Sequence, residues 1–167
     1  DEKQGESAVE LVTADVIVNV AGPWSSAINA MAGVGSDFTV SVRPMRQEVH
    51  QLKSGAGGLS RPIVGDLDLG VYSRSAPGGM TLFGGTEPEC DPLQWIDDVD
   101  SVNPKVTNEV FESQSLRIAK RFPSAQIPNA PTGVVGVYDV SSDWTPIYDR
   151  SEVDGFYLAI GTSGNQR

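Results

Sequence analysis

Residues 14–25 read ADVIVNVAGPWS and residues 154–165 read DGFYLAIGTSGN, and these two stretches decide the fold. Each contains a short, continuous apolar run, Val16 to Ala21 in the first and Phe156 to Ile160 in the second. Such runs predict strands that are buried on both faces and lie in the centre of a sheet. Glycine follows each run closely, and glycine lets a ligand approach the backbone. The sequence therefore predicts a large cofactor at the ends of two central strands.

The two stretches resemble segments of the FAD-dependent oxidoreductases of the D-amino-acid oxidase and sarcosine oxidase type. In that family, an A-D-x-V-V-x-A-x-G-x-W-S segment closes the dinucleotide domain over the cofactor, and a late D-G-x-Y-x-x-x-G-x-x-G segment returns to the flavin ring. Residues 42–51 (VRPMRQEVHQ) resemble the family's strand into the substrate domain. Residues 136–139 (GVYD) and 144–147 (WTPI) resemble its flavin-facing turn. The resemblance covers nearly the whole chain.

The resemblance implies an oxidoreductase that oxidises the C–N bond of an amine or amino acid, with hydride passing to FAD and water then hydrolysing the imine. It implies cofactor contacts from Ala21, Gly22 and Trp24 in one loop and from Gly161, Thr162, Ser163 and Gly164 in another. It also implies that Tyr138 shapes the substrate cavity. The position of Gly136 is a cysteine bonded to the flavin in some sarcosine oxidases, so glycine here implies FAD that is not covalently held at this position.

Two arginines are candidates for gripping a substrate carboxylate, because a guanidinium pairs bidentately with one. They are Arg43 and Arg46, of which we favour Arg46 as the catalytic-site residue. For either arginine, however, a salt bridge on the surface or between strands is the more typical role. His50 is the one histidine of the chain, and in an alternating strand it is more typical of a hydrogen-bonded sheet residue than of a base.

The rest of the chain predicts an α+β fold, with a mostly antiparallel substrate-domain sheet, a few helices, and outer strands that belong to an FAD-binding α/β domain. We expect residues 1–36 in the FAD-binding part, residues 37–140 in the substrate-binding domain, and residues 141–167 in the return to the FAD-binding part. The expected elements are a helix from Ser25 to Gly33 or Gly35, a strand over 38–52 interrupted at Pro44, a hairpin of 69–74 and 80–84, a helix from Asn103-Pro104 to Phe122, and a strand over 132–140.

The phosphate-binding motif with which the family begins, G-x-G-x-x-G, does not occur in this sequence. Gly33 and Gly35 come closest to it, but Phe38 stands at the third glycine position and no buried strand leads into them. We therefore expect a segment of a longer flavoenzyme, which needs the missing dinucleotide-binding portion as its partner and is inactive by itself. The alternative is a non-catalytic protein-binding or assembly module, with an exposed apolar patch where the flavin domain would sit.

Composition limits the other classes of function. The 167 residues carry a formal net charge of −10, which argues against nucleic acid and anionic membranes as partners. The one cysteine, Cys90, provides neither a disulfide framework nor a cysteine-ligated metal site. Asp97, Asp98 and Asp100 lack the spacing of a calcium loop, so we expect no metal site. We expect a cytoplasmic location and leave open whether the protein forms oligomers.

Overall fold

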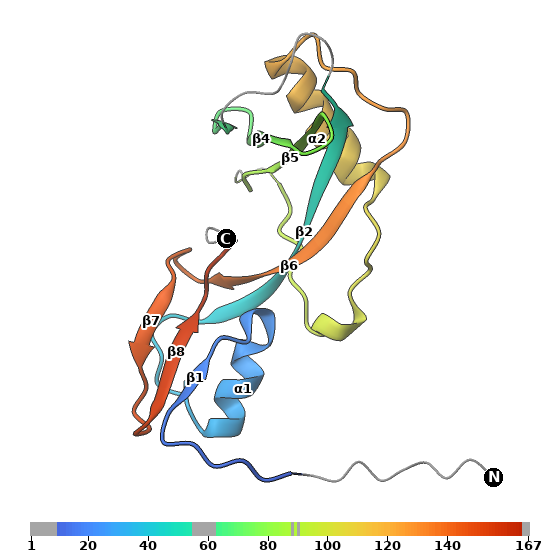
Figure 1. Ribbon diagram of the computed structural model, residues 1–167. Coiled ribbons are helices and arrows are strands. Elements are labelled where there is room, and N and C mark those ends of the chain that lie inside the picture. Colours follow the sequence, from blue (N-terminus) through green and yellow to red (C-terminus); the bar gives the residue numbers. More distant parts are fainter. Residues whose placement is uncertain (1–9, 55–62, 88, 90, 165–167) are drawn as a thin grey trace, which may run out of the picture.

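The structure, a computed structural model, describes residues 10–54, 63–87, 89 and 91–164. The described residues form two sheets and two α-helices (Figure 1). The first sheet has the order β1 (Ile17–Asn19), β8 (Phe156–Ile160), β7 (Ile147–Arg150). The second has the order β3 (Val64–Asp66), β4 (Val71–Ala76), β5 (Met80–Gly85), β2 (Val42–Lys53), β6 (Gly133–Ser141). The helices are α1 (Ser25–Ala32) and α2 (Asn108–Arg121), and the 3₁₀ turns are η1 (Gly22–Trp24) and η2 (Val99–Ser101).

The first sheet is mixed, because β1 runs parallel to β8 while β7 runs antiparallel to it. Helix α1 lies beside this sheet (Figure 1), over a core formed by Val34, Phe156, Leu158 and Ile160. The helix ends at Gly33, as the sequence predicted, because the glycine adopts the left-handed conformation at a φ of 70°.

The prediction that the first apolar run forms a central, fully buried strand is wrong for the described residues. β1 lies at the edge of its sheet and has β8 as its neighbour. Ile17 and Val18 are 53% and 49% exposed, and Asn19 is the buried residue of the strand. An apolar run indicates what a strand is able to bury, whereas burial on both faces requires neighbours that the described chain does not supply.

The second sheet is antiparallel throughout and is built around β2, its longest strand. β2 pairs with β6 from Val42 opposite Ser141 to His50 opposite Gly133, and this long ribbon connects the two halves of the molecule (Figure 1). The predicted interruption at Pro44 is wrong. The carbonyl of Pro44 accepts the N–H of Ile96 in a loop, so the N–H that proline lacks would also point to that loop and not to β6.

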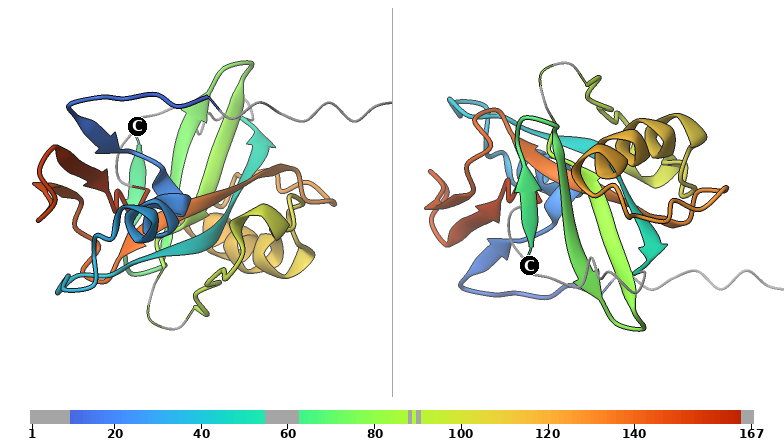
Figure 2. Two further views of the ribbon diagram at one scale, coloured as in Figure 1. Left: turned by 90° about the horizontal axis from the view of Figure 1, so that it is seen from below. Right: turned by 90° about the horizontal axis from the view of Figure 1, so that it is seen from above.

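Helix α2 covers one face of the second sheet (Figure 2). Its residues Phe111 and Ile118 join Leu52, Val71 and Phe83 in a buried apolar core. The hairpin β4–β5 forms where the sequence predicted it.

The predicted start of α2 at Asn103-Pro104 is wrong, because the helix begins at Asn108. Thr107 caps it, with its hydroxyl accepting the N–H of Val110 at 3.4 Å. The side chain of Asn103 accepts the N–H of Lys105 instead, and thereby closes a local turn before the helix.

These elements confirm the α+β class and the mostly antiparallel main sheet. The domain boundaries at residues 36/37 and 140/141 stay a prediction. Among the described residues, no helix is both long enough and apolar enough to cross a membrane. Cys90 lies outside the described residues.

Candidate active site

The two glycine turns predicted to contact a cofactor lie at the same edge of the first sheet. β1 and β8 are parallel neighbours, with Ile17 opposite Phe156 and Asn19 opposite Leu158. The turn of residues 20–24 follows β1, and the turn of residues 161–164 follows β8. Ligands of open α/β sheets bind outside the carboxyl ends of parallel strands. The fold thus brings the two predicted cofactor loops together from opposite ends of the described chain.

Asp139 anchors the second of these loops to β6. It is 5% exposed, and its carboxylate accepts the N–H of Gly161 at 2.8 Å and the hydroxyl of Thr162 at 2.7 Å. Its carbonyl accepts the N–H of Ser163 at 3.1 Å. Several groups that we expected to face the flavin therefore hold the loop in place. Sequence reasoning gave Asp139 no role, and the signal that could have found it was its place in the GVYD segment.

Asn19 anchors the first loop in a similar way. Its buried amide donates to the Ser25 carbonyl at 3.0 Å and to the Asn29 side chain at 2.7 Å, while its oxygen accepts the Ala21 N–H at 3.0 Å. Gly22 has a φ of 55°, and no heavy atom lies within 4 Å of the place where its Cβ would be. The backbone of this turn is therefore fixed by one side chain and open to a large planar group.

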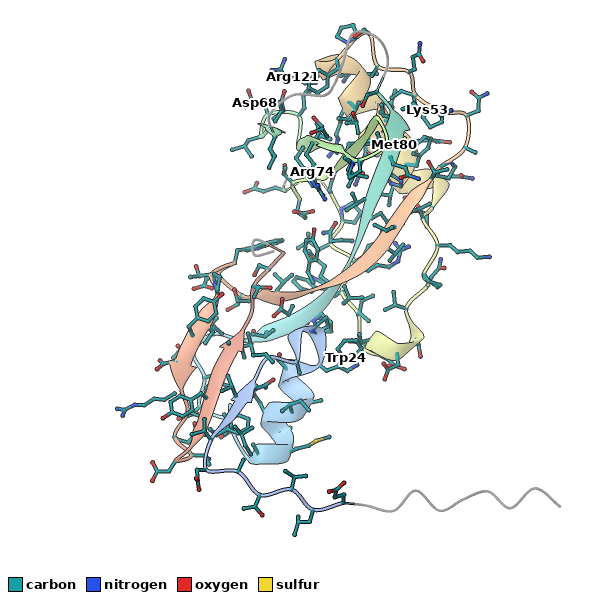
Figure 3. All side chains as sticks on the ribbon, viewed as in Figure 1. Trp24, Lys53, Asp68, Arg74, Met80 and Arg121 are labelled. Carbon is teal, nitrogen blue, oxygen red and sulfur yellow. The ribbon has the colours of Figure 1, made fainter. Side chains whose placement is uncertain are left out.

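Trp24 and Gly136 are the remaining predicted cofactor residues. Trp24 (labelled in Figure 3) is 46% exposed and donates its indole N–H to Asp100 at 3.2 Å. Gly136 pairs with Gln47 in the unbroken β2–β6 ladder, and a Cβ there would meet nothing within 4 Å. The structure thus leaves open space at Gly136.

Tyr138 packs directly against Gly164. A Cβ at Gly164 would lie 2.3 Å from Cε2 of the Tyr138 ring, and the glycine has a φ of 72°. Both the close approach and the left-handed backbone therefore require glycine at this position. The structure thus brings two of the predicted site residues into contact, and this contact leaves no room for a side chain at position 164.

A cavity of about 870 Å³ lies between this loop and the hairpin strand β4. Its lining includes Tyr138, Trp144 and Gly164. Arg74 of β4 (labelled in Figure 3) lines the same cavity, and its Nε is buried without a hydrogen-bond partner among the described residues. Sequence reasoning missed Arg74, although it alternates with the buried Val71 and Ser73 in a predicted strand. An unused buried N–H of a cation is suited to an anionic group of a ligand.

Arg46, the arginine that the sequence favoured, does not line this cavity. It is 8% exposed, and its guanidinium donates to the Glu48 carboxylate at 2.6 Å and to the Gln94 side chain at 2.9 Å. It also donates to the carbonyls of Asn103 at 3.2 Å and Lys105 at 2.7 Å. Its donors therefore hold the segment before α2 against β2, and the cavity with a free arginine donor is the one that contains Arg74.

Burial changes the acid–base properties of two residues near the sheet. Glu87 lines the large cavity, and burial raises its pKa from an ordinary 4.5 to about 7, while a hydrogen bond with Gln47 lowers it and the charge of Asp91 raises it. Burial also lowers the pKa of His50, whose ring is packed 5.3 Å from that of Phe111 between ring centroids. His50 is thus a neutral core residue near pH 7, and neither of its ring nitrogens has a hydrogen-bond partner among the described residues.

These features define a flavoprotein oxidoreductase fold, and comparison with known proteins supports this class. Residues 1–166 match the family described as FAD dependent oxidoreductase (DAO). The chain belongs to this family, which is FAD-dependent.

Among curated proteins, the chain is similar to FAD-dependent oxidoreductase domain-containing protein 1 of Mus musculus. The two are 29% identical over 165 residues, which cover 89% of this chain and 32% of the mouse protein. The protein of the same name from Bos taurus is 28% identical over 166 residues, covering 90% of this chain and 32% of its own length. The chain therefore spans about a third of the length of these relatives.

Two solved structures show the same fold. L-proline dehydrogenase from P. horikoshii matches with a TM-score of 0.69 and 21% identity, over 89% of this chain and 37% of that one. Glycine oxidase from Geobacillus kaustophilus matches with a TM-score of 0.69 and 18% identity, over 91% of this chain and 37% of that one. At these identities the likeness concerns the fold alone.

Proposed function

We propose that this chain forms the substrate side of an FAD-dependent oxidoreductase that oxidises the C–N bond of an amine or amino acid. The observation that carries the proposal is the cavity of about 870 Å³, which is bounded by the loop of Gly164 and contains the buried, unused donor of Arg74. In this proposal, residues 37–140 bind substrate and residues 1–36 and 141–167 belong to the FAD-binding part. The family match supports an FAD-dependent oxidoreductase, and the C–N bond is proposed as its target because the family's fold also occurs in a glycine oxidase and an L-proline dehydrogenase.

The residues present fit a flavin at the edge where β1 and β8 end. The turn of Ala21 and Gly22 offers open backbone there, and Gly164 keeps the second loop free of side-chain bulk. Trp24 flanks the first turn. Because Gly136 has no side chain, it cannot tether the flavin. The remaining cofactor contacts, including those to the pyrophosphate, belong to other parts of the longer protein, so the described fold alone is expected to be inactive.

Two residues of the cavity, Arg74 and Tyr138, have a task in this reaction. When bound, FAD supplies the acceptor for a hydride. Arg74 holds the substrate carboxylate through a paired guanidinium, and Tyr138 fixes the cavity wall next to Gly164, so that the α-carbon is oriented and water is kept away. The α C–H bond gives up the hydride, the nitrogen lone pair forms the C=N bond, a proton leaves the nitrogen, and water hydrolyses the resulting imine.

The test uses the full-length protein loaded with FAD, because the described fold alone is expected to be inactive. This protein is mixed anaerobically with a panel of amines and amino acids, and the loss of oxidised-flavin absorbance is followed. We expect amino acids to reduce the flavin. In Arg74→Met the KM for amino acids should rise by roughly 30- to 150-fold, since the lost charged hydrogen bonds are worth about 2–3 kcal/mol. Amines that lack a carboxylate should show no such change. If no amine reduces the flavin, the proposed function is wrong.

Arg46→Met serves as the matched control. Removing Arg46 leaves the buried Glu48 carboxylate without its cation, which should destabilise the fold by about 3–5 kcal/mol. It should not discriminate between substrates with and without a carboxylate. If the Arg46 variant folds normally but loses its selectivity for carboxylates, Arg46 and not Arg74 binds the substrate carboxylate.

One observation favours a second candidate function, a non-catalytic protein-binding or assembly module. The apolar residues Val16, Ile17, Val18 and Val20 are all exposed on or beside β1, and they form an apolar strip at the sheet edge. A flavin-domain strand and a separate protein partner would both fit this strip. FAD loading separates the two, because a binding module would take up no flavin.

A further inference from the structure

A second, smaller cavity lies where β5 separates from β2. The two strands pair as far as Val49 opposite Gly84, and beyond this point the N–H of Arg46 bonds to the Gln94 carbonyl of a loop instead. The opening in the sheet leads to a cavity of about 150 Å³ between β2, the segment 85–94 and α2. It therefore reaches through the sheet to the face that α2 covers.

This small cavity adjoins the proposed active site. Both cavities are lined by Gly85, Glu87, Asp91 and Leu93, so one wall is common to the two. A substrate held by Arg74 in the large cavity could extend its side chain past this wall. The small cavity is thus in a position to bind the end of a substrate side chain that lies away from the reacting C–N bond.

The lining of the small cavity is rich in hydrogen-bond acceptors. Gln114 of α2 is 6% exposed, and its Oε1 is buried without a hydrogen-bond partner among the described residues. Glu87 and Glu109 add two carboxyl groups. Within the described chain, neither of these two forms an ion pair with a cationic side chain.

The two arginines close to this cavity are already paired. Arg46 bonds to Glu48, and Arg117 of α2 bonds to Asp91. The carboxyl groups left without a cation among the described residues are Glu109 and Glu87. Burial raises the pKa of Glu87 to about 7, so Glu87 carries only part of a negative charge near pH 7, and an anionic side chain would still be repelled here. An apolar side chain would leave the Oε1 of Gln114 buried and unpaired, and this would cost binding free energy.

Gln114 and Glu87 converge on one point beside Gly85. A Cβ placed on Gly85 would lie 3.4 Å from Nε2 of Gln114 and 3.7 Å from Oε1 of Glu87. Gly85 has no side chain, and this leaves room between the two polar groups. A small donor group that enters there would meet the Glu87 oxygen directly, and rotation of the Gln114 amide would exchange its Nε2 for the unpaired Oε1 at this point.

We infer that the small cavity is a subsite for a substrate side chain that ends in a positively charged N–H donor, such as an ammonium group. This inference rests on the proposed function, and it names the substrate class as amino acids with a basic side chain. Glu87 and Gln114 are the specificity-determining residues, and Gly85 keeps the entrance open.

The test compares two ligands that cannot be oxidised at an α-amine. Calorimetry on the FAD-loaded protein measures the binding of 6-aminohexanoate, which is lysine without its α-amino group, and of hexanoate, which also lacks the terminal ammonium. We expect 6-aminohexanoate to bind at least tenfold more tightly. The ratio should fall towards one in Gln114→Leu, Glu87→Gln and Gly85→Ala, and should be retained in Glu112→Gln, an exposed carboxyl on the same helix.

Flavin reduction by DL-lysine and DL-norleucine is measured in parallel. Equal affinities, or a ratio unchanged in all three cavity variants, overturn the subsite, and flavin reduction by norleucine then still supports the proposed function. A tenfold ratio that collapses in the variants supports the subsite as a binding site even where neither amino acid reduces the flavin; the proposed function is refuted only if the whole panel of amines and amino acids also fails to reduce it. If neither carboxylate binds, the subsite and the carboxylate-binding role of Arg74 are both wrong.

Discussion

Replacing Asp139 tests the claim that one buried carboxylate holds the loop of residues 161–164 against β6. Asp139→Ala removes the acceptor of the Gly161 N–H, at 2.8 Å, and of the Thr162 hydroxyl, at 2.7 Å. Each bond to a charged group is worth about 1.5–3 kcal/mol, and the Gly161 N–H would be left buried and unpaired. We therefore expect the free energy of unfolding to fall by about 3–5 kcal/mol. For a domain of this size, that corresponds to a fall in Tm of roughly 10 °C.

The assay heats the FAD-loaded protein and follows two signals. Tryptophan fluorescence reports unfolding, and the rise of flavin fluorescence reports release of the cofactor. In Asp139→Ala both transitions should shift, with flavin release shifting at least as far. Asp139→Asn keeps one acceptor oxygen and should cost about 1–2 kcal/mol. Asp149→Ala is the control, because Asp149 is exposed on β7 and accepts the N–H of its neighbour Arg150. A Tm of Asp139→Ala within 1 °C of the unmodified protein would refute the reasoning.

Two further substitutions probe the same sheet ends and cavity. In urea unfolding, Gly164→Ala should destabilise the protein by about 2–4 kcal/mol, because the new side chain adds left-handed backbone strain and would lie 2.3 Å from the Tyr138 ring. Gly22→Ala should cost about 1–2 kcal/mol from backbone strain alone, because no heavy atom lies within 4 Å of its Cβ position. Equal costs would contradict the packing argument. Burial raises the pKa of Glu87 to about 7 in the folded protein, whereas its ordinary pKa is 4.5. Between these two pH values the folded protein holds a proton that the unfolded chain has lost, so the free energy of unfolding should fall as pH rises from about 4.5 to 7. Glu87→Gln should remove this decrease and be more stable than the unmodified protein at pH 8 but not at pH 4, measured by urea unfolding of the flavin-free protein; an unchanged pH profile would contradict the raised pKa.

The sequence was sufficient where a local pattern decides the structure. Glycine after each apolar run identified the two turns, and the parallel pairing of β1 with β8 places them at one edge. Gly33 marked the end of α1 because a left-handed residue stops a helix in any context. The start of α2 was misplaced because Asn103-Pro104 and Thr107 both offer capping chemistry, and the sequence does not show that Thr107 also binds the buried Glu48 carboxylate at 2.8 Å.

The candidate site was harder to predict because it depends on which face of a strand each arginine occupies. Every second residue of β2 from Arg46 to Leu52 is buried on the face that α2 covers; these are Arg46, Glu48, His50 and Leu52. That alternation was visible in the sequence, but an arginine among buried positions was interpreted as a ligand for substrate when it is a ligand for Glu48. The alternation of Arg74 with Val71 and Ser73 did not reveal its cavity, because the cavity is bordered by a loop more than eighty residues further along the chain.

The register between β2 and β6 is what unites the two halves of the proposed site. Neighbouring residues of β6 have different tasks: Tyr138 forms the cavity wall against Gly164, and Asp139 holds the loop through Gly161. Successive residues of a strand point to opposite faces, so a shift of one residue would exchange the two side chains. It would bring a carboxylate to the cavity wall and leave the loop without its acceptor. The nine paired positions from Val42 opposite Ser141 to His50 opposite Gly133 prevent this shift. The long ribbon therefore fixes the proposed substrate cavity and the proposed cofactor loop relative to each other.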